Sequence, residues 1–145
     1  MKRNWGRAVA GGLVGALVMS AVGMWVAPAV GLPKGNAADM LGGAMGGNIM
    51  LGWAAHLMIG IVLALIYAAV ASHIPGPPAI RGALYSIAPW LLAMLVVMPM
   101  MGMPVFGGGT APAIGSLINH LAYGLVLGAI YGQPDEAQDA NPVHA

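Results

Sequence analysis

The sequence predicts an all-α membrane protein: a four-transmembrane-helix bundle made of two duplicated helical hairpins, with both termini cytoplasmic. Hydrophobic residues make up 59% of the chain and charged residues only 6%. Soluble domains are about 25% charged, so this chain cannot cover itself with a solvated surface. Four apolar segments are long enough to cross a bilayer, and a histidine-containing segment occurs twice.

Four apolar windows predict the helices, at about residues 6–30, 49–72, 80–101 and 113–132. A spanning helix needs about 20 mostly apolar residues, and in lipid their backbone groups must bond within the helix. Residues 1–132 therefore form one transmembrane domain. The polar, acidic segment 133–145 is expected to be a disordered cytoplasmic tail.

The first window also resembles a signal peptide, because its apolar stretch follows a basic start. This stretch is longer than the roughly 7–15 residues of a signal peptide, and Pro28 stands where small residues would mark cleavage. We therefore expect a retained helix.

The segments around the windows carry helix signals of their own. Asn36, three residues before Asp39, predicts a cap for one interfacial turn in the first outer loop. Thr110 marks a helix start before the fourth window. Pro89 and Pro99 predict that the third helix kinks or ends early, because proline lacks the N–H that a helix interior needs.

The basic residues predict the orientation. Arg7 and Arg81, at the starts of the first and third windows, are the expected topology anchors, and Lys2 and Arg3 lie on the same side. Only Lys34 falls on the other side. The positive-inside rule then places both termini in the cytoplasm.

An internal repeat links the second and fourth windows. Segments 56–67 and 120–131 share seven of twelve residues without a gap, including a histidine and a tyrosine. These two matches are informative because the chain has only four histidines and four tyrosines. The first and third windows agree more weakly, since each starts with an arginine and finishes near a proline, Pro28 or Pro104. We infer a duplicated hairpin with a pseudo-twofold axis along the membrane normal.

The repeat predicts that His56 and His120 lie at equal depth and face a common centre. At 100° per residue, each shares a helical stripe with small residues spaced by four. Such residues allow close helix approach, so Gly60, Gly124 and Gly128 are expected to pack against other helices.

The two histidines are the candidate functional residues, because polar ionisable groups inside a membrane are costly. One interpretation is hydrogen bonding across the helix interface, for instance to Ser116, Asn119 or a backbone carbonyl. The alternative is that His56 and His120 bind b-type haem or a metal, since two imidazoles on a pseudo-twofold axis suit six-coordinate iron. A proton or quinone role is also open.

Methionines give a second, weaker signal. Thioethers suit Cu(I), but methionine is also a common filler of irregular gaps between helices. The outer end of the third window carries the candidate metal cluster Met98, Met100, Met101 and Met103.

Several classes of function are excluded. Five basic residues cannot build the phosphate-binding surface of a nucleic-acid binder. The chain has no cysteine, hence no disulfide, iron–sulfur cluster or thiol nucleophile. The windows contain no Asp or Glu, which disfavours carboxylate-based pumps and leaves no catalytic constellation.

Five short motifs stand out along the chain: Gly31-Leu-Pro-Lys34, Gly52-Trp-x-x-His56, Ile74-Pro-Gly-Pro77, Arg81-Gly82 and Gly115-Ser-Leu-x-x-His120. Through them the chain resembles an uncharacterised family of small bacterial inner-membrane proteins, loosely of the YagU type, over residues 7–132. The resemblance implies a four-helix fold in the inner membrane and no particular activity.

We therefore expect a non-enzymatic accessory or structural subunit, surrounded by lipid and packed against other transmembrane helices in a homo-oligomer or a larger complex. The alternative is a redox protein that binds haem b or a metal through His56 and His120. A small transporter is the third interpretation.

Overall fold

The computed structural model describes residues 3–133, and this part of the chain is almost entirely helical. The prediction of four apolar helices long enough to cross a membrane is confirmed. The largest difference is in the fourth, which begins at Thr110 rather than at residue 113. The spanning segments are Trp5–Ala29, Ile49–His73, Pro78–Met100 and Thr110–Tyr131.

Each spanning segment is built from one long helix with shorter continuations. The first contains α1 (Trp5–Ala21), the π-turn η1 (Val22–Val26) and α2 (Ala27–Ala29). A short α3 (Ala37–Ala44) precedes the second, which contains α4 (Ile49–Val70) and η2 (Ala71–His73). The third contains α5 (Pro78–Leu92), the π-turn η3 (Ala93–Val97) and α6 (Met98–Met100). The turn η4 (Val105–Gly108) leads into the fourth, α7 (Thr110–Tyr131).

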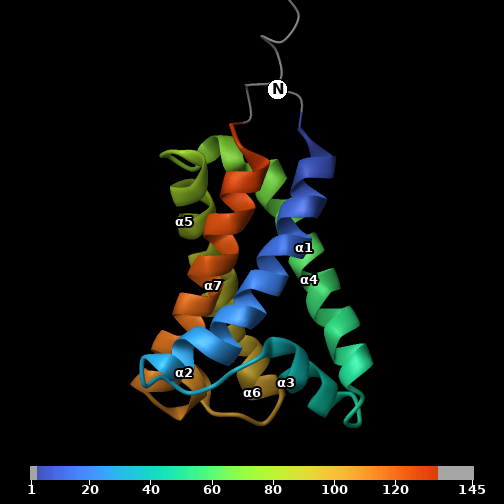
Figure 1. Ribbon diagram of the computed structural model, residues 1–145, viewed down its shortest axis with the longest axis vertical. Helices are drawn as coiled ribbons and strands as arrows, with labels where there is room; N and C mark the ends of the chain where they lie inside the picture. Colours follow the sequence, from blue (N-terminus) through green and yellow to red (C-terminus); the bar gives the residue numbers. More distant parts are fainter. Residues whose placement is uncertain (1–2, 134–145) are drawn as a thin grey trace, which may run out of the picture.

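The four long helices pack in the order α4, α1, α7, α5. Helix α7 lies along both α1 and α5, and α1 also packs on α4, whereas α4 and α5 hardly touch. Both described ends of the chain lie at one end of the bundle, and α3 and α6 lie at the other (Figure 1). The bundle is therefore closed on one side and loosely packed on the other, between α4 and α5.

Close glycine contacts join the helices of each hairpin. A Cβ on Gly12 of α1 would lie 2.6 Å from the Gly60 carbonyl oxygen of α4, so no side chain fits there. In the second hairpin Gly82 of α5 lies equally tightly against Gly124 of α7, and Gly128 lies against the carbonyl group of Pro78. Absent side chains let the backbones approach, which is how helices pack without a hydrophobic effect between them.

Proline shapes the first and third spanning segments in the same way. The π-turns η1 and η3 are each followed by a three-residue helix with proline in the middle, Pro28 or Pro99. The proline ring clashes with the carbonyl four residues earlier, and the wider turn relieves this clash. Pro89 lies within α5 and does not end it. Pro99, rather than the expected Pro104, occupies the same position relative to its π-turn as Pro28 does. The freed carbonyl of Gly23 accepts a 3.1 Å hydrogen bond from the Gly35 N–H.

The loop between the first and second spanning segments contains a longer helix than expected. Asn36 caps α3 as predicted, with its Oδ1 accepting a 3.1 Å hydrogen bond from the Ala38 N–H. Instead of a single turn, α3 runs over eight residues, because Gly42 and Gly52 let it pack closely on the start of α4. This helix lies at the end of the bundle opposite to the described termini (Figure 1).

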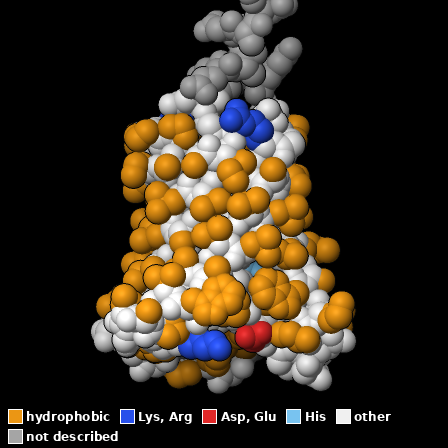
Figure 2. Space-filling model, in the orientation of Figure 1, with side chains coloured by type: hydrophobic (Ala, Val, Ile, Leu, Met, Phe, Trp, Pro, Cys, Tyr) orange, Lys and Arg blue, Asp and Glu red, His pale blue; other side chains and the backbone are white. Residues whose placement is uncertain are grey.

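Charged side chains lie at the two ends, separated by an apolar flank (Figure 2). Arg7 donates a 2.9 Å hydrogen bond from Nε to the Ile130 carbonyl, one of the last carbonyls of α7. Arg81 donates from Nη1 to Oε1 of Gln133, at 3.2 Å. Both arginines thus lie at the C-terminal end of α7, where cations are favoured by the helix dipole. The predicted acidic tail falls, apart from Gln133, outside the described residues.

Candidate functional site

A cavity of about 360 Å³ lies between α4 and α5, in the half of the bundle nearer α3. This volume falls in the range of roughly 300–1,000 Å³ that is typical of small-molecule sites. Ile59 of α4 and Leu92 of α5 line it and are also 46% and 54% exposed on the outer surface of the bundle. In a bilayer this surface faces acyl chains, so the cavity opens sideways to lipid.

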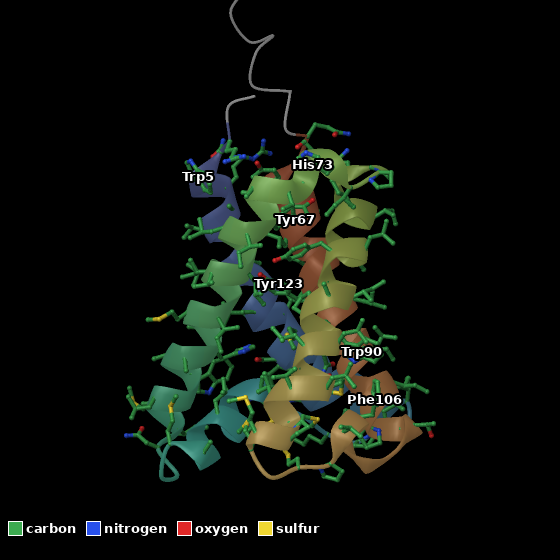
Figure 3. The ribbon with its side chains drawn as sticks, turned by 180° about the vertical axis from the view of Figure 1, so that it is seen from behind. Trp5, Tyr67, His73, Trp90, Phe106 and Tyr123 are labelled. Carbon is green, nitrogen blue, oxygen red and sulfur yellow. The ribbon has the colours of Figure 1, made fainter. Side chains whose placement is uncertain are left out.

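Tyrosines close the other half of the space between α4 and the second hairpin (Figure 3). The Tyr123 hydroxyl donates to the Gly60 carbonyl at 2.6 Å, and the Tyr85 hydroxyl donates to the Leu63 carbonyl at 2.8 Å. Beyond them the fully buried Tyr67 ring packs against Tyr85, with ring centroids 5.2 Å apart. The cavity therefore ends at this tyrosine layer rather than crossing the bundle.

His56 lines the cavity and is held against α1. Its Nε2 lies 3.1 Å from the Ala16 carbonyl oxygen and 3.1 Å from the Ser20 hydroxyl, and the residue is 5% exposed. A carbonyl can only accept, so Nε2 carries the proton. Ser20 donates its own hydrogen to Asn36 Oδ1 at 3.1 Å, which leaves its oxygen free to accept from Nε2. In the neutral imidazole the unprotonated nitrogen is then Nδ1.

His120 lines the same cavity from α7. Its Nδ1 lies 2.8 Å from the Ser116 carbonyl oxygen, so Nδ1 carries the proton and Nε2 is the unprotonated nitrogen. One residue earlier, the buried Oδ1 of Asn119 has no hydrogen-bond partner within the described chain. Two unshared ring nitrogens thus belong to residues that line the cavity, and an unpaired amide oxygen is buried in its wall, which is mostly apolar and also carries Lys34, Asn36 and Ser116.

The two predicted ligands therefore meet at one cavity, but their surroundings differ. His56 bonds to a different helix, whereas His120 bonds within its own helix. Each has one N–H on a backbone carbonyl and one bare nitrogen, which is the state that a metal ligand needs. Among the described residues no group of three or more His, Cys, Asp or Glu side chains converges on a metal position. Two imidazoles alone would leave most metals incompletely coordinated.

The four methionines of the predicted cluster differ in how they lie relative to the cavity. Met98 lines it, Met100 is 81% exposed, and Met101 and Met103 are not among the lining residues. Three methionines from other segments line the cavity instead: Met19, Met40 and Met94. Methionine is a flexible, apolar gap filler, so these side chains give the wall a shape that can adapt to a ligand.

Sequence reasoning missed the Ser20–Asn36 pair that holds His56. Ser20 is a polar residue in the middle of an apolar window, and this position could have indicated that its side chain bonds to another helix. Asn36 was recognised only as a helix cap. Its Oδ1 accepts from Ser20 as well as from the backbone of α3, so the start of α3 is connected through Ser20 to His56.

Four helices of spanning length and apolar composition define the chain as a multi-pass membrane protein. It belongs to a family of unknown function, DUF6789, whose model matches residues 2–141. Neither the curated proteins nor the solved structures contain a match to this chain. Membership of an uncharacterised family is thus confirmed, whereas the YagU resemblance and the bacterial origin stay predictions.

Proposed function

We propose that the protein is a binding protein that holds a small, largely apolar, membrane-soluble molecule between α4 and α5. The observation that carries this proposal is the cavity of about 360 Å³ that opens to the lipid-facing surface and contains polar groups at its inner wall. Such a combination of apolar walls and a few convergent polar atoms is typical of ligand sites.

The position of the polar atoms supports a ligand with one polar end. His56 and His120 lie on the wall away from the lipid entrance, on helices that pack against α1 and α5 respectively. Ile59 and Leu92 lie at the entrance. A molecule entering from the bilayer would place its polar end at the histidines and leave its apolar part between α4 and α5.

A cavity-filling variant tests this function. Ala93 lines the cavity, so Ala93→Phe should fill much of it, whereas Ala88→Phe adds the same side chain to an exposed position of α5. Native mass spectrometry should detect bound small molecules on the purified wild-type protein and on the Ala88→Phe variant. We expect the Ala93→Phe variant to carry none of them. Equal retention by all three proteins would show that the cavity is not the site.

The expected accessory-subunit role is the second candidate, and one observation favours it. On the α3 side of the Tyr85–Leu63 hydrogen bond the backbones of α4 and α5 stay apart, so a helix of another chain could pack against this opening. The chain has no cysteine, which allows clean single-cysteine cross-linking. A partner helix at this opening would cross-link to Ile59→Cys but not to Val14→Cys, which lies exposed on α1.

We also propose that the two hairpins arose by duplication and that both termini are cytoplasmic, in a bacterial inner membrane. The matched glycine contacts and the matched π-turns before Pro28 and Pro99 support the duplication. The excess of basic residues at the end that carries Arg7 and Arg81 supports the orientation. The two halves differ in one respect: α1 packs along α7, whereas the backbones of the equivalent pair, α5 and α4, stay apart.

A further inference from the structure

We infer that the ligand presents hydroxyl groups, rather than carbonyl, carboxylate or phosphate oxygens, to the bare ring nitrogens of His56 and His120. This inference rests on the proposed function, because it concerns the polar end of the molecule in the same cavity. In each imidazole, one ring nitrogen is hydrogen-bonded to the chain and the other is left without a partner among the described residues.

His120 offers an acceptor. The 2.8 Å contact between its Nδ1 and the Ser116 carbonyl fixes the proton on Nδ1. An imidazole among apolar side chains is neutral, because a charge there has no compensation. Its Nε2 is then a lone pair that receives no hydrogen bond from the described chain, and only a hydrogen-bond donor or a Lewis acid can satisfy it.

His56 offers a second acceptor by an independent route. Its Nε2 proton is shared between the Ala16 carbonyl and the Ser20 hydroxyl, both at 3.1 Å. Because Ser20 in turn donates to Asn36, the direction of the chain of hydrogen bonds is fixed and the imidazole cannot switch tautomer without breaking it. The remaining ring atom, Nδ1, is a lone pair without a donor in the described chain.

The other polar groups of the described wall give an anion no buried positive charge. Asn119 Oδ1 is buried without a partner, and a Cβ on Gly23 of η1 would lie 2.7 Å from Asn119 Nδ2. The Tyr123 hydroxyl, a donor at the floor, is already bonded to the Gly60 carbonyl. Ser116 can donate or accept, and the cation Lys34 is at the exposed outer rim. An anion placed between the histidines would therefore meet lone pairs and no buried positive charge.

The volume and the lateral opening favour an organic molecule over a metal ion as the donor. A single ion needs neither a cavity of about 360 Å³ nor an entrance from lipid. A hydroxyl-bearing ring or chain uses both features and can donate to one or both nitrogens. A hydroquinone is a suitable probe, because removing its two hydrogens gives a quinone of nearly the same shape that can only accept.

The test measures binding of three matched probes to the full-length protein in lipid nanodiscs under anaerobic conditions. The probes are tetramethylhydroquinone, the corresponding quinone and the dimethyl ether of the hydroquinone. We expect the hydroquinone to bind at least roughly tenfold more tightly than the other two, which corresponds to about 1.4 kcal/mol. Because this comparison uses the unmodified protein, it does not depend on whether a histidine variant folds.

Two variants assign the preference to its residues. His120→Phe and His56→Phe should each reduce the ratio between hydroquinone and quinone affinities, while Ala88→Phe leaves it unchanged. Equal or tighter binding of the quinone to the wild-type protein would overturn the hydroxyl inference.

The remaining outcomes separate this inference from the proposed function. If all three probes bind equally and Ala93→Phe abolishes their binding, the cavity is the site and only the hydroxyl inference fails. If no probe binds, or if Ala93→Phe binds them as the wild type does, both fail.

Discussion

The Tyr123 hydroxyl of α7 donates a 2.6 Å hydrogen bond to the Gly60 carbonyl of α4. This bond joins two helices that belong to different hairpins, at the level where the cavity ends. It also places a polar contact beside the glycine that lets α1 approach α4. Gly60 is thus the point at which α1, α4 and α7 meet, and the cavity ends at the same level.

Tyr123→Phe should lower the stability of the bundle slightly, because it removes this bond and leaves the ring. Hydrogen bonds between transmembrane helices contribute about 0.6 kcal/mol on average and up to about 1.7 kcal/mol. Tyr131→Phe is the matched control, since its hydroxyl lies 3.4 Å from the Ala68 carbonyl and makes a weaker bond. Thermal unfolding in mild detergent should give the larger loss for Tyr123→Phe, and the reverse order would contradict this account.

Gly124→Leu should prevent correct packing of the second hairpin. Even a Cβ at this position would lie 2.7 Å from the Ser86 Cβ and still closer to the Gly82 carbonyl. Overpacking of this kind typically costs about 1–3 kcal/mol, and a whole leucine side chain has no room here. Ala129→Leu, at an exposed position of the same helix, is the control. Size-exclusion profiles should show aggregation only for Gly124→Leu; a normal profile would mean that α5 and α7 can separate.

The purified protein is expected to be colourless. Under the inference above, the bare ring nitrogens, Nδ1 of His56 and Nε2 of His120, accept from hydroxyl groups of the ligand rather than bind iron. An absorption spectrum from the ultraviolet to the visible checks this directly. A Soret band with low-spin b-type features, lost in both His56→Ala and His120→Ala, would establish the haem alternative instead.

Copper is not expected to stay bound through a mild chelator wash. Of the four methionines at the outer end of the third helix, Met98 alone lines the cavity, and Met100 points outward. Metal analysis of protein purified with Cu(I) gives the measurement. Retained copper that disappears when Met98, Met100, Met101 and Met103 are replaced together would show that this segment closes around a metal.

Reporter fusions after residue 7 and after residue 132 should both report a cytoplasmic location. Arg7 and Arg81 lie at the end where α7 finishes. Lys34, just before α3, and Asp39, within α3, lie at the opposite end. A periplasmic signal from either fusion would exclude the proposed orientation.

The helices could be predicted because their signals are local. Length and apolarity are enough to locate four spans, and Asn36 caps α3 in the way its side chain suggests. The two π-turns could not be predicted: Pro28 and Pro99 indicate a disturbance, but whether a helix bends, ends or widens depends on what packs around it.

The cavity could be predicted only in part. The repeat pointed to His56 and His120, and the structure places both on one wall. The cavity itself arises because α1 and α7 pack together while the backbones of α4 and α5 stay apart, and the shared residues of the repeats do not predict this difference. Met19, Met40 and Met94 come from separate segments, so no sequence spacing could have grouped them.

The π-turns before Pro28 and Pro99 also bear on ancestry. A π-turn is formally one residue inserted into an α-helix, and such insertions tend to persist at functional positions. Under the proposed duplication, a single insertion in an ancestral hairpin accounts for both turns, so the ancestral hairpin already carried it. An ancestor of that kind would have paired with a second copy of itself, and the asymmetry between the two sides of the present bundle would then be the younger feature.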